Sequence, residues 1–207
     1  MEDRYAFEHQ MARKGFRRVC GIDEAGCGPL AGPVYAAAVI LNPEDPIEGL
    51  NDSKKLSEKR REALFEVILD RALAFAVAWV EHDEIDCLNI LEARLMAMRR
   101  AVACMSIAPD CALVDGNRDP GLEVETLLIT GGDGLSASIG AASIMAKVLR
   151  DRRMREEATR YPVYRFEKHK GYPTALHYHL LDAHGPSPIH RQSFLNKWRA
   201  RQGGGAH

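Results

Sequence analysis

Three apolar segments of this chain end in acidic residues beside glycine, and this pattern constrains the fold more than any other. Short apolar runs that stop at glycine are typical of buried strands. The carboxyl ends of parallel strands meet at one edge of a sheet, so distant points of the sequence can converge there. An acidic site at a sheet edge is therefore predicted. The segments are residues 18–22, 111–114 and 125–130, and their acids are Asp23 with Glu24, Asp115 and Asp133.

The other periodic segments indicate an α/β fold. Residues 33–41 and 74–81 are also apolar or alternating, so they are expected to form an antiparallel meander with the first strand. Helical segments lead into the later strands, which should run parallel to the first. The prediction is a mixed five-stranded sheet flanked by helices. Helices are expected at residues 57–72, 90–106, 135–158, 174–183 and 192–201.

The length of 207 residues suits one structural unit. Residues 1–160 are expected to form the core. After the break at Tyr161 and Pro162, residues 161–207 are expected to form a small helical extension packed on it. The glycine-rich end, residues 202–207, is predicted to be disordered.

Charge is divided unevenly along the chain. Residues 1–146 hold 15 Lys and Arg against 24 Asp and Glu, whereas residues 147–207 hold 13 against 5. An acidic part joined to a basic part suits a site that must hold both cations and a polyanion.

The cellular environment is predicted from the cysteines and the termini. The five cysteines form no C-x-x-C pair, which argues against a disulfide framework and a zinc site. The charged start lacks an apolar run, and the longest apolar stretch is too short to span a membrane. A cytoplasmic protein without a membrane segment is expected.

Converging carboxylates indicate metal-dependent chemistry. Their charges repel, so they stay ionised together only around a cation. Hard oxygen ligands favour Mg²⁺ or Mn²⁺, and two such ions about 3.5–4 Å apart form the clamp used in phosphodiester hydrolysis. Each acid alone is also explained as a turn residue or a helix cap, as at Asp133. Asp23 and Glu24 are adjacent, so on a regular strand they point to opposite faces.

An ordered series of motifs runs along the chain, at residues 21–34, 51–57, 114–117, 132–133, 141–151, 168–172 and 185–191. This series resembles the ribonuclease HII family, the prokaryotic type 2 ribonuclease H. The resemblance covers about residues 17–195.

The resemblance implies a ribonuclease H-like fold and an endonuclease that acts as a monomer. Such an enzyme hydrolyses the RNA strand of RNA–DNA hybrids and incises 5′ to ribonucleotides embedded in duplex DNA. It leaves a 3′-hydroxyl and a 5′-phosphate. By this similarity two Mg²⁺ or Mn²⁺ ions bind at the family's catalytic acids, which match Asp23, Glu24, Asp115 and Asp133.

The resemblance also suggests the residues that bind substrate. Tyr172 matches a tyrosine that stacks on the sugar after the ribonucleotide and helps to sense its 2′-hydroxyl, the group that separates RNA from DNA. Candidate contacts to the backbone phosphates carry no base information. The expected substrate-binding residues are Gly26, Cys27, Gly28, Lys54, Lys55, Ser143, Lys147 and Tyr172.

Cys27 departs from the family pattern, which has arginine between the two glycines. Gly26 and Gly28 still allow close approach by the backbone. A cysteine cannot supply the charge or the fork of donors of an arginine. Weakened substrate affinity or weakened preference for the RNA–DNA junction is therefore expected, with ion binding intact.

Other functions also fit parts of the pattern. A DNA nuclease of the same fold, a protein that binds hybrids without cutting them, and a nucleotide-binding protein that uses residues 131–138 are the alternatives. The last lacks the G-K-[ST] signature. Residues 192–198 have the Q-x-x-L-x-x-aromatic spacing of sliding-clamp peptides, but Arg199 stands where a second aromatic is expected, and a packed C-terminal helix is the alternative there.

Overall fold

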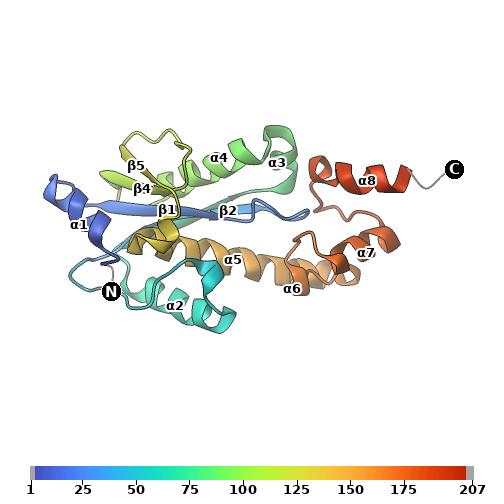
Figure 1. Ribbon diagram of the computed structural model, residues 1–207, viewed down its shortest axis with the longest axis horizontal. Coiled ribbons are helices and arrows are strands. Elements are labelled where there is room, and N and C mark those ends of the chain that lie inside the picture. Colours follow the sequence, from blue (N-terminus) through green and yellow to red (C-terminus); the bar gives the residue numbers. More distant parts are fainter. Residues whose placement is uncertain (1–2, 204–207) are drawn as a thin grey trace.

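A mixed sheet forms the centre of the computed structural model, which describes residues 3–203. Its strands are β1 (Val19–Ala25), β2 (Val34–Ile40), β3 (Ala74–Val80), β4 (Cys111–Asp115) and β5 (Glu125–Ile129). Their order across the sheet is β3-β2-β1-β4-β5 (Figure 1). β2 is antiparallel to both β1 and β3, whereas β4 is parallel to both β1 and β5. The predicted meander and parallel strands are confirmed.

Helices cover both faces of this sheet (Figure 1). α5 (Ala137–Arg160) and α2 (Glu58–Arg71) enclose one apolar core with the sheet. α4 (Ile90–Ala103) and α3 (His82–Leu88) enclose the other. The alternation of β-strand side chains divides β1 between these cores, because successive residues point to opposite faces.

Small side chains at the start of α5 let this helix lie directly on β1. A Cβ added to Gly21 would come within 2.1 Å of the Ser138 carbonyl carbon. Ala141 and Ala142 are fully buried in the same contact layer. Two residues after Gly21, Asp23 is on the same face of the strand and so is also covered by α5.

The helices at residues 6–13 and 82–88 were not predicted from the sequence. α1 (Ala6–Arg13) is mostly polar, yet its Glu8 is buried and accepts hydrogen bonds from Ser136 Oγ at 2.6 Å and Ser138 N at 2.9 Å. α3 begins with a capping box formed by Glu81 and Glu84. Both helices are held by polar contacts, and the periodicity of apolar residues in the sequence does not reveal such contacts.

The C-terminal segment packs on the connection between β1 and β2. Leu30 N donates to Gly171 O at 2.8 Å, and Gly32 N donates to Ile189 O at 2.9 Å. Leu30 also shares an apolar cluster with Leu181 and Leu195. The segment contains η3 (Pro162–Tyr164), α6 (Phe166–His169), α7 (Ala175–His184), η4 (Gln192–Leu195) and α8 (Asn196–Gly203).

The predicted helix at residues 192–201 is therefore a 3₁₀ turn followed by α8. Gln202 and Gly203, which the sequence placed in a disordered tail, belong to the end of α8. The remainder of that tail, residues 204–207, lies outside the described residues.

The cysteines and the helices bear on the cellular environment predicted from the sequence. Cys20, Cys27, Cys87, Cys104 and Cys111 are all free thiols, as predicted. Within residues 3–203, no helix combines the length and the apolarity that a membrane crossing requires.

Buried histidines hold the C-terminal segment together. His177 Nε2 lies 2.9 Å from His190 Nε2, and the His169 ring stacks on that of His177 at 4.1 Å. His190 Nδ1 is 2.8 Å from Ser187 N. His177 Nδ1 also lies 3.0 Å from Tyr172 O, so the cluster positions the loop that carries Tyr172.

Stability is expected to fall as the pH is lowered from about 6.5 towards 4. Burial lowers the pKa of His177 to about 4 and that of His190 to about 3, so both rings are neutral in the folded protein. The unfolded chain binds these protons near pH 6.5, so each ring lowers the free energy of unfolding by about 1.4 kcal/mol per pH unit. Urea denaturation at pH 7, 6 and 5 measures this slope.

His177→Gln should reduce that slope by about one proton. The same substitution at His179, which is exposed on the same helix, is the matched control. A slope equal to the native one in His177→Gln would contradict the assignment.

Candidate active site

The strand register brings two of the predicted acids, Asp23 and Asp115, together. Ile22 pairs with Val114 in the parallel β1–β4 ladder, so the next residues, Asp23 and Asp115, lie on adjacent strands at the same edge. Asp133 follows β5 in η2 (Gly132–Gly134), beside the same edge. The predicted convergence of distant sequence points thus follows from parallel strands whose carboxyl ends coincide.

Asp23 is the most deeply buried of these acids, with 4% of its surface exposed. Burial raises its pKa well above the ordinary value, and the neighbouring charges of Glu24 and Asp115 raise it further. A hydrogen bond from Ser143 on α5 opposes this effect. Asp23 is therefore a carboxylate that is unfavourable in its charged form and fixed in direction by its neighbours.

Glu24 points to the opposite face of the sheet, as the strand alternation predicts. Its Oε1 accepts a hydrogen bond from Arg94 Nη1 on α4 at 3.1 Å and lies 3.6 Å from Cys27 Sγ. Its Oε2 is buried and has no hydrogen-bond partner. β1 ends one residue later, at Ala25, so Glu24 lies at the rim where the strand stops.

The other two acids are held near the ends of β4 and β5. Asp115 Oδ1 accepts a hydrogen bond from Gly132 N at 2.7 Å, which ties η2 to β4. Burial raises the pKa of Asp133, and the charges of Asp115 and Asp52 add to this rise. Asp52, to which sequence reasoning gave no role, is therefore a fifth carboxylate of the site.

A lysine lies within the field of these carboxylates. Burial acts to lower the pKa of Lys54, but Asp23, Asp52 and their neighbours raise it above its ordinary value. The Lys54 ammonium therefore neutralises part of the acidic cluster. Lys55 is more exposed, and its Nζ lies 3.9 Å from Asp52 Oδ2.

The donor set fits a hard divalent cation. It consists of carboxylate oxygens, one of which is the unpartnered Glu24 Oε2, and it includes a buried Asp23 whose charge is opposed by its neighbours. In the described part of the chain, no three acidic, histidine or cysteine side chains already converge on one metal position. Glu24 would have to turn from Arg94, and Asp115 from Gly132 N, to share an ion.

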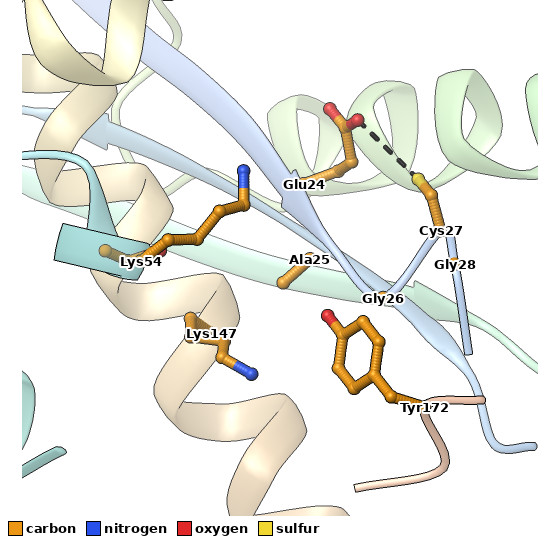
Figure 2. A pocket seen from close by; sticks show the side chains of 9 residues that line it. Glu24, Ala25, Gly26, Cys27, Gly28, Lys54, Lys147 and Tyr172 are labelled. Atoms are coloured by element: carbon orange, nitrogen blue, oxygen red, sulfur yellow. Dashed lines mark hydrogen bonds between the residues drawn. The ribbon is translucent and has the colours of Figure 1, made fainter. Parts of the chain in front are cut away.

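A pocket of about 220 Å³ adjoins these acids and holds most of the predicted substrate-binding residues. Figure 2 shows Lys54, Lys147 and Tyr172 around the same space as the glycine-flanked Cys27. Lys147 Nζ donates to Asp151 Oδ1 at 2.8 Å and lies 5.3 Å from the Tyr172 ring centroid. Two cationic side chains and one aromatic ring therefore face one cleft, which suits a stacked, negatively charged chain.

Ser143 has a different place from the other candidates. It is buried, its hydroxyl donates to Asp23, and its Oγ lies 2.9 Å from Ser53 Oγ. This position allows Ser143 to orient Asp23 rather than to face the pocket.

Two buried arginines fix the backbone of the pocket, and sequence reasoning gave them no role. Arg191 donates to Gly32 O at 2.9 Å, Cys27 O at 3.1 Å and Gly26 O at 2.7 Å. Arg150 donates to the carbonyls of Pro33, Ala31 and Lys170, and it lies 5.6 Å from the Tyr172 ring centroid. An arginine inside a motif gave no signal of such a role in the sequence, because only the folded structure shows which carbonyls it meets.

Gly26 requires its glycine for two reasons. Its φ of +102° favours glycine, and an added Cβ would come within 2.1 Å of Arg150 Nε. Gly28, by contrast, faces the open side of the pocket, where Tyr172 Cε1 lies 3.9 Å from an added Cβ. The segment therefore presents its backbone to the cleft.

Comparison with known proteins agrees with this geometry. The sequence model of the family described as Ribonuclease HII matches residues 20–197. A ribonuclease HII of Dechloromonas aromatica is 61% identical over 176 residues, which cover 85% of this chain and 90% of the relative.

Solved structures share the fold. The ribonuclease H2 of Pyrococcus horikoshii superimposes with a TM-score of 0.75 at 27% identity, covering 89% of this chain and 98% of that one. A complex of PCNA with ribonuclease HII of Archaeoglobus fulgidus gives 0.69 at 25% identity, covering 85% and 94%. The chain therefore belongs to the ribonuclease HII family of metal-dependent endoribonucleases, which cleave the RNA of RNA–DNA hybrids.

Proposed function

We propose that this enzyme also incises duplex DNA on the 5′ side of an embedded ribonucleotide, leaving a 3′-hydroxyl and a 5′-phosphate. The observation that carries this proposal is that the acids and the pocket lie at the same edge of the sheet. Asp23 and Asp115 lie on adjacent strands, and Glu24 borders a cleft that also contains Tyr172. A backbone phosphate at the acids thereby places a neighbouring sugar at the ring.

Asp23, Glu24, Asp115 and Asp133 would hold two Mg²⁺ or Mn²⁺ ions. Bound ions of this kind lower the pKa of an attacking water and stabilise the leaving 3′ oxygen. The oxygen-only donor set and the raised pKa of Asp23 and Asp133 support this assignment. Mg²⁺ and Mn²⁺ both fit such ligands.

The protein's own groups prepare the site. Ser143 orients Asp23, and the Gly132 amide fixes Asp115. Lys54 offsets the like charges of the acids and lines the cleft, where it can meet a phosphate oxygen. The Ser143 contact sets the direction of Asp23 before substrate arrives, which limits reorganisation there, whereas Asp115 would turn from Gly132 N to share an ion.

Recognition of the ribonucleotide falls to the two sides of the cleft. Arg191 holds the carbonyls of Gly26 and Cys27, so the amides of this segment can face a 2′-hydroxyl. Tyr172, backed by Lys147, offers a flat ring to the adjoining sugar. A deoxyribose lacks the hydroxyl and would leave these donors unused.

We also propose that the enzyme acts as a monomer in the cytoplasm. Five free thiols suit a reducing compartment. A sliding-clamp contact, of the kind present in the A. fulgidus complex, would need a change at residues 192–198. Leu195 of that segment is fully buried against Leu30 and Leu181, and Trp198 Nε1 donates to Asp182 Oδ1 at 2.7 Å. Clamp binding through this segment would therefore require α8 to detach.

Cleavage of an end-labelled DNA duplex that contains one ribonucleotide tests the proposal. We expect incision 5′ to the ribonucleotide with Mg²⁺ and with Mn²⁺, and none with a chelator or on all-DNA duplex. Tyr172→Ala should slow this incision more than it slows cleavage of a long hybrid. Cleavage of the long hybrid alone would refute ribonucleotide incision, and binding without any cleavage would identify a hybrid-binding protein.

A further inference from the structure

An arginine to which the sequence analysis gave no role reaches the catalytic carboxylates from α4. Arg94 Nη1 donates to Glu24 Oε1 at 3.1 Å, and the same oxygen lies 3.6 Å from Cys27 Sγ. The Arg94 guanidinium and the Cys27 thiol therefore share one acceptor. This arrangement places a guanidinium directly beside the position at which the sequence lacks an arginine.

Arg94 differs from the other guanidinium groups near Cys27. Arg191 and Arg150 are fully buried, and both donate to three backbone carbonyls. The Arg94 side chain is 23% exposed, and among the described residues its guanidinium donates only to Glu24, through Nη1. Arg94 therefore has donors to offer, whereas the two buried arginines are committed to the backbone.

The charge of the site indicates what those donors meet. A cation that Glu24 ligates would compete with Arg94 for the same carboxylate, because both positive charges are attracted to it. Glu24, the partner that Arg94 would lose, lines the pocket, and a guanidinium freed beside it suits the oxygens of a phosphate, which its planar fork matches. The polyanionic substrate supplies such oxygens along its whole length.

We propose that Arg94 is a substrate-binding residue that contacts a backbone phosphate next to Gly26–Gly28 and replaces, from α4, the guanidinium missing at Cys27. This inference rests on the proposed function, because it requires a duplex to lie across the pocket. It also changes the expectation that Cys27 weakens substrate affinity, since the affinity lost at Cys27 would be restored by Arg94 from α4.

Substitutions at the two positions test the replacement directly. With a fluorescein-labelled duplex that contains one ribonucleotide, Arg94→Ala should raise the Kd about tenfold and lower the salt dependence of binding by about one phosphate contact. Cys27→Arg alone should change the Kd little, because Arg94 already supplies the guanidinium that contacts the phosphate. Cys27→Arg combined with Arg94→Ala should restore most of the lost affinity, which is the non-additivity of neighbouring groups.

Controls separate this role from charge, folding and the proposed function. Arg100→Ala removes the same charge from the exposed side of α4, where Arg100 pairs with Glu84, and should leave the Kd unchanged. Arg94→Lys keeps the charge without the planar pair of guanidinium donors and should give an intermediate Kd. Thermal melting confirms that each variant is folded. Fluorescence anisotropy in chelator measures binding without cleavage, so a native protein that binds but never cuts would refute the proposed function alone. Native affinity in folded Arg94→Ala, or no recovery in the double variant, would overturn the role of Arg94.

Discussion

Asp23→Asn is expected to lower kcat on an RNA–DNA hybrid by on the order of 10³-fold or more while the protein stays folded. Asp23 lies at the centre of the acidic edge, between Glu24 along its own strand and Asp115 on the next. An amide keeps the shape of the side chain but removes the charge that a bound cation needs. Single-turnover cleavage with Mg²⁺ measures the effect without product release.

The same substitution should not weaken the fold. Burial and two neighbouring carboxylates raise the pKa of Asp23, so its charge opposes folding at neutral pH. In chelator the free energy of unfolding of Asp23→Asn should equal or exceed the native value by about 1 kcal/mol. Added Mg²⁺ or Mn²⁺ should stabilise the native protein more than the variant, because only ions that bind the folded state shift its stability.

Asp110→Asn is the matched control, because it should lower stability without lowering activity, the reverse of Asp23→Asn. Asp110 precedes β4, away from the acidic edge, and accepts hydrogen bonds from the amides of Arg17 and Arg18. Although burial opposes the effect, these bonds and the charge of Arg18 lower its pKa, so its loss should reduce stability and spare activity. If Asp23→Asn kept more than a tenth of native activity, Asp23 would not be a catalytic acid.

The sequence allowed the architecture to be predicted because each strand is a local signal. The apolar runs that end at Asp23, Asp115 and Asp133 mark three strands whose parallel pairing requires only helical crossovers. The opposite directions of Asp23 and Glu24 also follow from strand alternation. The adjacency of Asp23 and Asp115 was therefore predictable, whereas the hydrogen-bond partners of each carboxylate were not.

Other parts of the site depend on contacts between residues far apart in the chain. Glu8 holds α1 in place through Ser136 and Ser138. A helix held by polar contacts of this kind shows no apolar periodicity in the sequence. Arg94 lies on an amphipathic helix, where a partly exposed arginine is usually a solvated residue. Only the packing of α4 against the end of β1 brings it to Glu24.

Arg191→Met is expected to lower the free energy of unfolding by about 3–5 kcal/mol. Arg191 is fully buried, and its three hydrogen bonds satisfy the carbonyls of Gly26, Cys27 and Gly32. Methionine fills similar space but leaves those carbonyls without a donor, and an unsatisfied buried polar group is costly. Urea denaturation of the full chain measures the loss.

Activity should fall together with stability, because the same bonds hold the backbone that faces the cleft. The kcat/KM of Arg191→Met on a single-ribonucleotide duplex should drop by about 10²-fold, since small displacements of a positioning element have large effects. Arg191→Lys keeps a charge but cannot reach three carbonyls, so it should recover only part of either loss. Arg199→Ala, at an exposed arginine that bonds Gln192 O, should change neither. Native stability in Arg191→Met would show that the Gly26–Gly28 backbone is held by other contacts, and the positioning role assigned to this arginine would be wrong.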